Sequence, residues 1–247
     1  MYRFFVDDSQ IGKQQIAITG SDVNHIRNVL RMKPGERIMV SDGKKMDYCC
    51  RIRETGDQKV IADILETVEA AGELPARIHL FQGLPKSDKM ELIIQKAVEL
   101  GVWQVIPTVT KRAVVKLDKK KEEAKVRRWN SIAESAAKQS GRSRIPQVTE
   151  AMTLKQALAC AKEFDVKVIP FEHARGMEET ARQMERIRPG TDVGIFIGPE
   201  GGFEDEEISM AESEGITPIS LGRRILRTET AGLMILSVIG YLLETKD

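Results

Sequence analysis

The chain has 247 residues, of which 41% are hydrophobic and 30% are charged, a composition typical of a globular protein with an ample core. No run of about 18 apolar residues occurs, so no membrane span is predicted, and we expect no secretion signal because the N-terminus lacks a basic region followed by an apolar one. Cys49, Cys50 and Cys160 lack the spacing of a disulfide or a metal site. This favours reduced thiols, a cytoplasmic protein and no metal.

Charge is unevenly distributed along the chain, although the formal net charge is only +1. Residues 105–146 carry 12 Lys or Arg against 4 Asp or Glu, a net charge of +8. Residues 163–214 carry 5 against 14, a net charge of −9. We expect the basic segment to face a polyanion and the acidic segment to face elsewhere. Ordinary solvated helix faces are the alternative explanation.

The N-terminal part predicts a small β-barrel over residues 1–70. Short β segments alternate with turns, and one helix over 22–30 interrupts them, with Ser21 placed to cap it. The expected strands cover residues 3–6, 15–18, 37–41, 47–53 and 59–66. A linker follows and ends at Pro75.

From residue 76 the pattern changes to strands that alternate with helices. The expected strands cover residues 77–84, 105–109, 166–171, 192–197 and 216–221, and the expected helices 88–100, 122–139, 153–163, 205–213 and 229–244. This alternation predicts right-handed βαβ units and a mostly parallel sheet. Residues 76–247 therefore read as a second domain with an α/β fold.

Three loops of this domain follow an apolar strand, at residues 170–174, 198–203 and 221–231. Ligands bind outside the carboxyl ends of the strands in an open α/β sheet, so these loops form a candidate ligand site. The glycines of the second loop would let a ligand approach the main chain. This loop has neither the Gly-Lys-Ser/Thr ending of a P-loop nor a GxGxxG pattern.

The helix after the second loop opens with four acidic residues, 204–207, which suit the helix dipole but would repel a phosphate. A nucleoside with a cationic end and no phosphate therefore fits better, and S-adenosylmethionine is one. A turn rich in glycine for steric reasons is the alternative. The third loop mixes Arg223, Arg224 and Arg227 with apolar residues. Its apolar side chains and amides could hold an adenine while an arginine faces a substrate.

In the second and third loops the sequence resembles a known family. Gly198-Pro199-Glu200-Gly201-Gly202, together with Leu221-Gly222-x-x-Ile225-Leu226-Arg227-x-Glu229-Thr230-Ala231, looks like the paired motifs of the RsmE family. These are bacterial methyltransferases of the SPOUT superfamily that act on N3 of a uridine in small-subunit ribosomal RNA. Segments 3–6, 25–31, 86–91, 99–102 and 134–142 also match, so the resemblance covers nearly the whole chain.

The resemblance implies a trefoil-knotted α/β domain preceded by a PUA-like RNA-binding barrel, and a homodimer with its sites near the subunit interface. S-adenosyl-L-methionine would be the cofactor, and small-subunit ribosomal RNA, within the small ribosomal subunit, the substrate. The expected cofactor-binding residues are Pro170, Phe171, Glu172, Ile197, Gly198, Pro199, Glu200, Gly201, Gly202, Leu221, Gly222, Ile225, Leu226, Arg227 and Ala231.

Uracil N3 is a poor nucleophile while it carries its proton, so the site needs a base or a positive group that favours the imide anion. We expect Arg227 to stabilise negative charge on the uracil carbonyls, and Glu200 or Glu229 to take the proton directly or through water. A structural ion pair is the alternative role for Arg227.

RNA contacts are expected from the basic segment and from the barrel. The candidates are Arg3, His25, Arg27, Arg31, Lys111, Arg112, Arg128, Lys138, Gln139, Arg142 and Arg144. For His25, a solvated surface position is an equal alternative. Two other functions stay open: methylation of a ribose 2′-hydroxyl or a transfer RNA base, and a non-catalytic role as an RNA-binding assembly factor.

Overall fold

A computed structural model describes residues 1–113 and 119–245 and divides into two compact units. Unit 1 comprises Met1–Glu73 and Ala137–Ile145, and unit 2 comprises Leu74–Ala136 and Pro146–Asp247. After Leu74–Ala136 the chain therefore returns to unit 1 at Ala137–Ile145. The boundaries expected from the sequence, 1–70 and 76–247, did not include this return.

Unit 1 is built on a curled five-stranded sheet with the order β1-β3-β4-β5-β2. Its strands are β1 (Arg3–Phe5), β2 (Gln15–Thr19), β3 (Arg37–Ser41), β4 (Met46–Thr55) and β5 (Lys59–Glu69). β1 runs parallel to β3 and the other pairs are antiparallel. Alternate side chains of these strands, such as Ile16 and Ile18, point to one face and form a single core.

The helix expected over residues 22–30 is two short turns. α1 (Ser21–Asn24) is followed by a π-helical turn, His25–Val29. Ser21 was expected to cap the helix, but it is the first helical residue and Gly20, at φ 76°, precedes it as the cap. The positive φ at Gly20 favours glycine there, which displaces the cap by one residue.

Unit 2 is built on a parallel sheet with the order β12-β10-β11-β6-β7-β8, and β9 also pairs with β7. The strands are β6 (Arg77–Gly83), β7 (Gln104–Val109), β8 (Gln147–Val148), β9 (Met152–Thr153), β10 (Val166–Pro170), β11 (Asp192–Ile197) and β12 (Thr217–Ile219). The central strands are buried along their length, as parallel strands covered on both faces must be.

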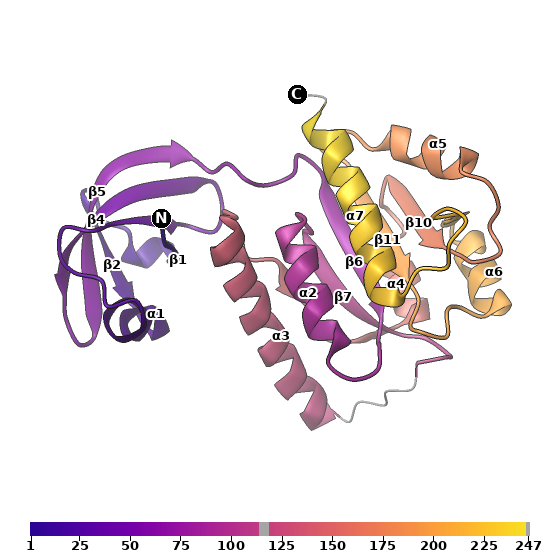
Figure 1. Cartoon of the computed structure of the whole chain (residues 1–247), viewed down its shortest axis with the longest axis horizontal. Coiled ribbons are helices and arrows are strands. Elements are labelled where there is room, and N and C mark those ends of the chain that lie inside the picture. Colours follow the sequence, from indigo (N-terminus) through magenta and orange to yellow (C-terminus); the bar gives the residue numbers. More distant parts are fainter. Residues whose placement is uncertain (114–118, 246–247) are drawn as a thin grey trace. The chain divides into compact units, whose positions relative to one another are not determined.

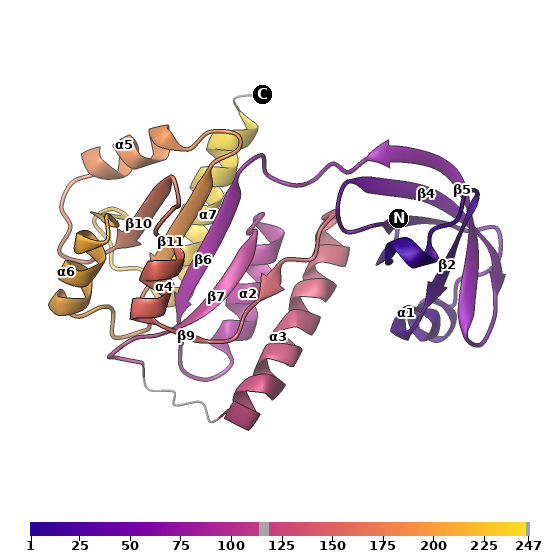
Figure 2. The same ribbon diagram turned by 180° about the vertical axis from the view of Figure 1, so that it is seen from behind.

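Helices cover both faces of this sheet. They are α2 (Lys89–Glu99), α3 (Lys119–Ser140), α4 (Leu154–Cys160), α5 (Glu178–Arg186), α6 (Asp205–Ser213) and α7 (Thr228–Glu244). α2 and α7 lie side by side in front of the sheet in Figure 1, and α4 lies in front of it in Figure 2. The sequence pattern did not predict α5. No helix in the described part of the chain is long and apolar enough to span a bilayer.

Candidate active site

The direction in which the chain adds strands to the parallel sheet reverses between β6 and β11. β7 lies on one side of β6, and β11 and β10 lie on the other side. Such a switch point opens a crevice at the carboxyl ends of the strands. Gly83 ends β6 against the loop that follows β11: a Cβ atom on Gly83 would lie 2.6 Å from the nitrogen of Pro199. Glycine is therefore required where this strand meets the loop.

The loops at these strand ends enclose a cavity of about 450 Å³. Its lining combines the segments after β10, β11 and β12 with the first residues of α7. All fifteen residues expected to bind the cofactor lie in this lining, so the structure brings the three sequence-predicted loops together. Their role in cofactor binding stays a prediction. The lining also contains Lys89, Phe203, Ser220, Arg223, Arg224 and Thr228.

Lys89 was not predicted, because the three candidate loops followed other strands and the segment after β6 was not among them. Lys89 begins α2, directly after the connection from β6. β6 also ends at the crevice, so the rule that ligands bind at the carboxyl ends of parallel strands could have identified the residues that follow it.

Lys89 connects the two candidate catalytic carboxylates. Its Nζ lies 3.0 Å from Oε1 of Glu200 and 3.4 Å from Oε2 of Glu229. The Glu229 oxygen is an ion-pair neighbour of the ammonium but has no hydrogen bond of good geometry among the described residues. Glu200 also accepts from the backbone amide of Lys86, at 3.2 Å. Glu200 thus holds the β6–α2 connection against the glycine loop.

These contacts keep Glu200 ionised. Partial burial of its carboxyl raises the pKa of Glu200, but its own backbone amide, Lys89 and the Lys86 amide outweigh burial and lower the pKa from its ordinary 4.5. The hydrogen bond to Glu200 raises the pKa of Lys89. An anion with a lowered pKa is a weak proton acceptor, so the geometry suits Glu200 to anchoring more than to general-base work.

Arg227 is the N-cap residue of α7 and is exposed at the cavity. Within the described part of the chain, its guanidinium has no hydrogen bond or ion pair, and the nearby Glu229 pairs with Lys89 instead. The alternative of a structural ion pair therefore has no support in the geometry. A cation without a carboxylate partner is available to a substrate.

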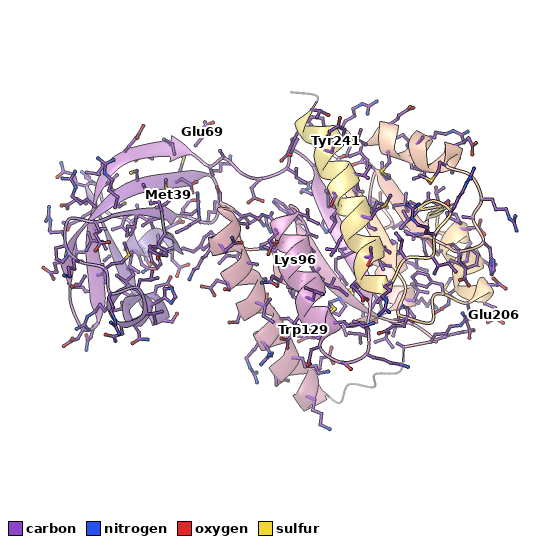
Figure 3. The ribbon with its side chains drawn as sticks, in the orientation of Figure 1. Met39, Glu69, Lys96, Trp129, Glu206 and Tyr241 are labelled. Atoms are coloured by element: carbon purple, nitrogen blue, oxygen red, sulfur yellow. The ribbon has the colours of Figure 1, made fainter. Side chains whose placement is uncertain are left out.

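Lys111 and Arg112, two candidate RNA contacts, bind the acidic start of α6. Lys111 pairs with Glu206, which Figure 3 labels, and its Nζ lies 3.3 Å from Glu204. Arg112 Nη1 donates to the carbonyl of Gly201 at 2.7 Å. The expectation that the acidic segment faces away from the basic one is wrong here, because opposite charges attract across a short distance. Residues 114–118 of the basic segment lie outside the described residues.

Three further RNA candidates are enclosed within unit 1. They form the ion pairs Arg3–Asp47 at 2.7 Å, Lys138–Asp22 at 2.7 Å, and Arg142–Glu73. The Arg142 side chain is 3% exposed, and the Ser143 hydroxyl beside it donates to Asp47 at 3.0 Å. A guanidinium enclosed in this way has no face left for a phosphate. Arg142 therefore has a structural role, fixing the returning segment to the barrel, and we withdraw it from the RNA contacts.

The remaining candidates differ in exposure. His25, Arg31 and Gln139 are exposed, and Arg144 is half-buried. Arg27 pairs with Asp57 at 2.7 Å, and Arg128 Nη2 donates to Glu91 at 2.9 Å. Exposed pairs of this kind are weak and can exchange a carboxylate for a phosphate. No cluster of His, Cys, Asp and Glu that could hold a metal ion occurs among the described residues.

Comparison with known proteins now identifies the family. A model of the RNA methyltransferase domain matches residues 72–240, and a model of the RNA methyltransferase PUA domain matches residues 18–65. The chain belongs to this RNA methyltransferase family. It is 38% identical to ribosomal RNA small subunit methyltransferase E of Bacillus subtilis, over 99% of this chain and 98% of that protein.

Two further relatives support the assignment. The protein of the same name from Mesomycoplasma hyopneumoniae is 35% identical over 96% of this chain and 98% of its own. The crystal structure of ribosomal RNA small subunit methyltransferase E from Neisseria gonorrhoeae, bound to S-adenosyl methionine, superposes with a TM-score of 0.84 at 29% identity over 98% of each chain. The match spans both units, so the family resemblance and the α/β fold with a PUA-like domain are confirmed. The trefoil knot stays a prediction.

Proposed function

We propose that this protein transfers a methyl group from S-adenosylmethionine to N3 of a uridine in small-subunit ribosomal RNA, in the cytoplasm. The free guanidinium of Arg227 beside the glycine loop carries the proposal, because it meets the requirement of uracil N3 for a nearby positive charge. The family assignment supports the wider activity, methyl transfer to RNA.

The cavity suits a nucleoside with a cationic end. Glycine lets the loop fold tightly on itself, since a Cβ atom on Gly198 would lie 3.1 Å from Cα of Gly202, whereas nothing lies within 4 Å of a Cβ position on Gly202. Leu221, Ile225 and Leu226 supply apolar surface for an adenine, and Glu172 and Glu200 supply negative charge for a cation. The positive charge on its sulfur is what makes the methyl group of S-adenosylmethionine electrophilic when it is bound.

Methylation at N3 would require the N3–H bond to break, and the nitrogen to bond to the methyl carbon as the bond from that carbon to sulfur breaks and the neutral thioether leaves. We assign to Arg227 the stabilisation of the imide anion through the uracil carbonyls. Of the two candidate proton acceptors, Glu200 lines the cavity and Glu229 does not. Because the lowered pKa makes Glu200 a weak base, we assign the larger role to charge stabilisation by Arg227 and to alignment, with the proton passing through water to Glu200.

A homodimer is supported by the apolar surface that α2 and α7 present. Leu92 on α2 is 46% exposed, and Val238 and Tyr241 on α7 are 36% and 67% exposed. The two helices lie side by side, and Tyr241 projects from α7 in Figure 3. Large exposed apolar residues on neighbouring helices mark an interaction surface, and an isologous contact between two copies would bury them.

The decisive experiment is incubation of unmodified small ribosomal subunits with this protein and S-adenosylmethionine carrying a labelled methyl group. Mass spectrometry of the digested RNA should locate one label on N3 of a uridine. Label on a ribose 2′-hydroxyl, or on transfer RNA offered in parallel, would favour the alternative function, methylation of a ribose 2′-hydroxyl or of a transfer RNA base. An assembly factor without catalysis predicts no heat of S-adenosylmethionine binding in calorimetry.

A further inference from the structure

A buried glutamine and threonine connect the two halves of the candidate active site. Gln82, at the penultimate position of β6, is fully buried, and Thr228, the first residue of α7, is 6% exposed. Gln82 Nε2 donates to the Gly83 carbonyl at 3.0 Å and to the Thr228 hydroxyl at 2.9 Å. Thr228 Oγ1 donates in turn to the carbonyl of Gly198 at 2.6 Å.

The direction of each hydrogen bond in this series is fixed by the carbonyl groups of Gly83 and Gly198, at which the series ends. Carbonyls only accept, so the amide nitrogen of Gln82, and not its oxygen, must face Gly83. The same nitrogen donates to Thr228, whose single hydroxyl proton is then available only for Gly198. This series of hydrogen bonds therefore has one consistent arrangement of protons, and each hydrogen bond depends on the one before it.

These bonds join elements that are far apart in the sequence. Gly198 is the first residue of the glycine loop after β11, and Thr228 directly follows Arg227. A single hydroxyl thus sets the distance between the glycine loop and the end of the loop that carries the arginine. β6, the neighbour of β11 in the sheet, supplies the fixed point through Gln82.

Stability alone does not account for a glutamine at this position. Gln82 Oε1 is buried and has no hydrogen-bond partner among the described residues. Burying an amide oxygen without a partner is unfavourable, and an apolar side chain of the same length would avoid that cost. A buried polar group retained at such a cost is better explained by the geometry that its nitrogen imposes.

We propose that Gln82 and Thr228 are positioning residues for methyl transfer, a brace that aligns the glycine loop with Arg227. The proposal rests on the proposed function, since it takes the cavity as the site of transfer. Neither side chain acts on the substrate. Their effect is on the alignment of the reacting groups, in which an error of about 1 Å can slow a reaction by about 100-fold.

The test compares two substitutions of Thr228. Thr228→Val keeps the shape and removes the hydroxyl, and should lower kcat for transfer of labelled methyl to small ribosomal subunits by up to about 100-fold, with little change in KM for the RNA. Thr228→Ser keeps the hydroxyl and should retain most of the rate. Thr108→Val is the matched control, because Thr108 is also buried and its hydroxyl donates only within its own strand, to Ile106 at 3.1 Å.

Substitutions of Gln82 provide an independent test of the same proposal. Gln82→Met removes the donor, and Gln82→Glu replaces it with an acceptor that would draw the Thr228 proton away from Gly198, so both should slow transfer as Thr228→Val does. Equal rates for Thr228→Val and Thr108→Val at matched melting temperatures would overturn the brace. Because total label is counted, transfer by the unaltered protein to an atom other than N3 would reject the proposed function and leave this comparison valid.

Discussion

Nζ of Lys89 lies 3.0 Å from Oε1 of Glu200, and this contact is one of those that lower the pKa of the only glutamate that the glycine loop contributes to the cavity lining. It joins the start of α2 to the loop after β11, two segments that the sequence separates by more than a hundred residues. The pair is therefore both an anchor for the loop and an electrostatic feature of the site.

Replacement of Lys89 by Met should raise the pKa of Glu200 towards its ordinary value of 4.5, because the ammonium is one of the groups that lower it. Lys89→Arg keeps a positive charge and should leave the pKa low. Carbon-detected NMR of the labelled glutamate carboxyl carbons, followed through acid titration, would measure both. A Glu200 pKa that does not move in Lys89→Met would show that the backbone amides alone hold the carboxylate.

The pH dependence of stability follows from the same shift. A carboxyl whose pKa is lowered on folding stabilises the protein above its unfolded pKa of about 4.5, and this contribution is lost as the pH falls through the lower folded value. Glu200→Gln should therefore reduce the free energy of unfolding at neutral pH, and the difference from the unaltered protein should vanish in acid. Urea denaturation at a series of pH values tests this. A difference that grew below about pH 4 would have the wrong sign.

Arg227→Ala should lower the rate of methyl transfer by about 100-fold to 1,000-fold, the usual effect of removing one group that stabilises developing charge. Cofactor affinity in calorimetry should stay close to normal, because the apolar and main-chain parts of the cavity remain. Arg223→Ala, which removes another arginine from the same lining, is the control for a general loss of positive charge. Similar losses in both variants would assign the effect to overall charge instead of to Arg227.

The position of the site could be predicted from the sequence because the features that locate it are local. Apolar strands followed by a loop identify the carboxyl ends of β10, β11 and β12, with distinctive glycine and arginine content in the last two loops, and the parallel sheet brings those ends together. Lys89 and Gln82 were missed because neither has a distinctive neighbourhood in the sequence. Their importance arises from partners more than a hundred residues away, Glu200 and Thr228.

The same limit explains the errors in charge and capping. Nothing local distinguishes Arg142, which is buried against Glu73, from the exposed Arg31. Ser21 was expected to cap the helix over residues 22–30, but it is the first residue of α1 and Gly20 precedes it as the cap. Local preference identifies the residue types that suit a helix start, and tertiary packing decides which of them takes the position.

Arg142→Met should lower the free energy of unfolding of unit 1 by about 3 kcal/mol, because the partly buried Glu73 would lose the charge that neutralises it and keep the backbone amides of Ser143 and Arg144. Arg27→Met is the matched control, since the partner of Arg27, Asp57, is 89% exposed, and loss of a surface pair costs at most about 1 kcal/mol. Chemical denaturation measures both. If Arg142→Met were as mild as Arg27→Met, the enclosed pair would not be what fixes residues 137–145 to the barrel.

Arg31 should bind an RNA phosphate. It is exposed, and in unit 1 it follows the π-helical turn His25–Val29, which contains the RNA candidates His25 and Arg27. Its backbone has φ 52°, which asparagine tolerates well, so Arg31→Asn removes the charge without adding strain. The slope of log affinity for RNA against log salt concentration should then become shallower by about 0.7 to 0.9, the contribution of one phosphate contact. Arg31→Lys keeps the charge and should keep the slope, as measured by fluorescence anisotropy with labelled small-subunit RNA fragments. An unchanged slope in Arg31→Asn would remove this residue from the RNA-binding surface.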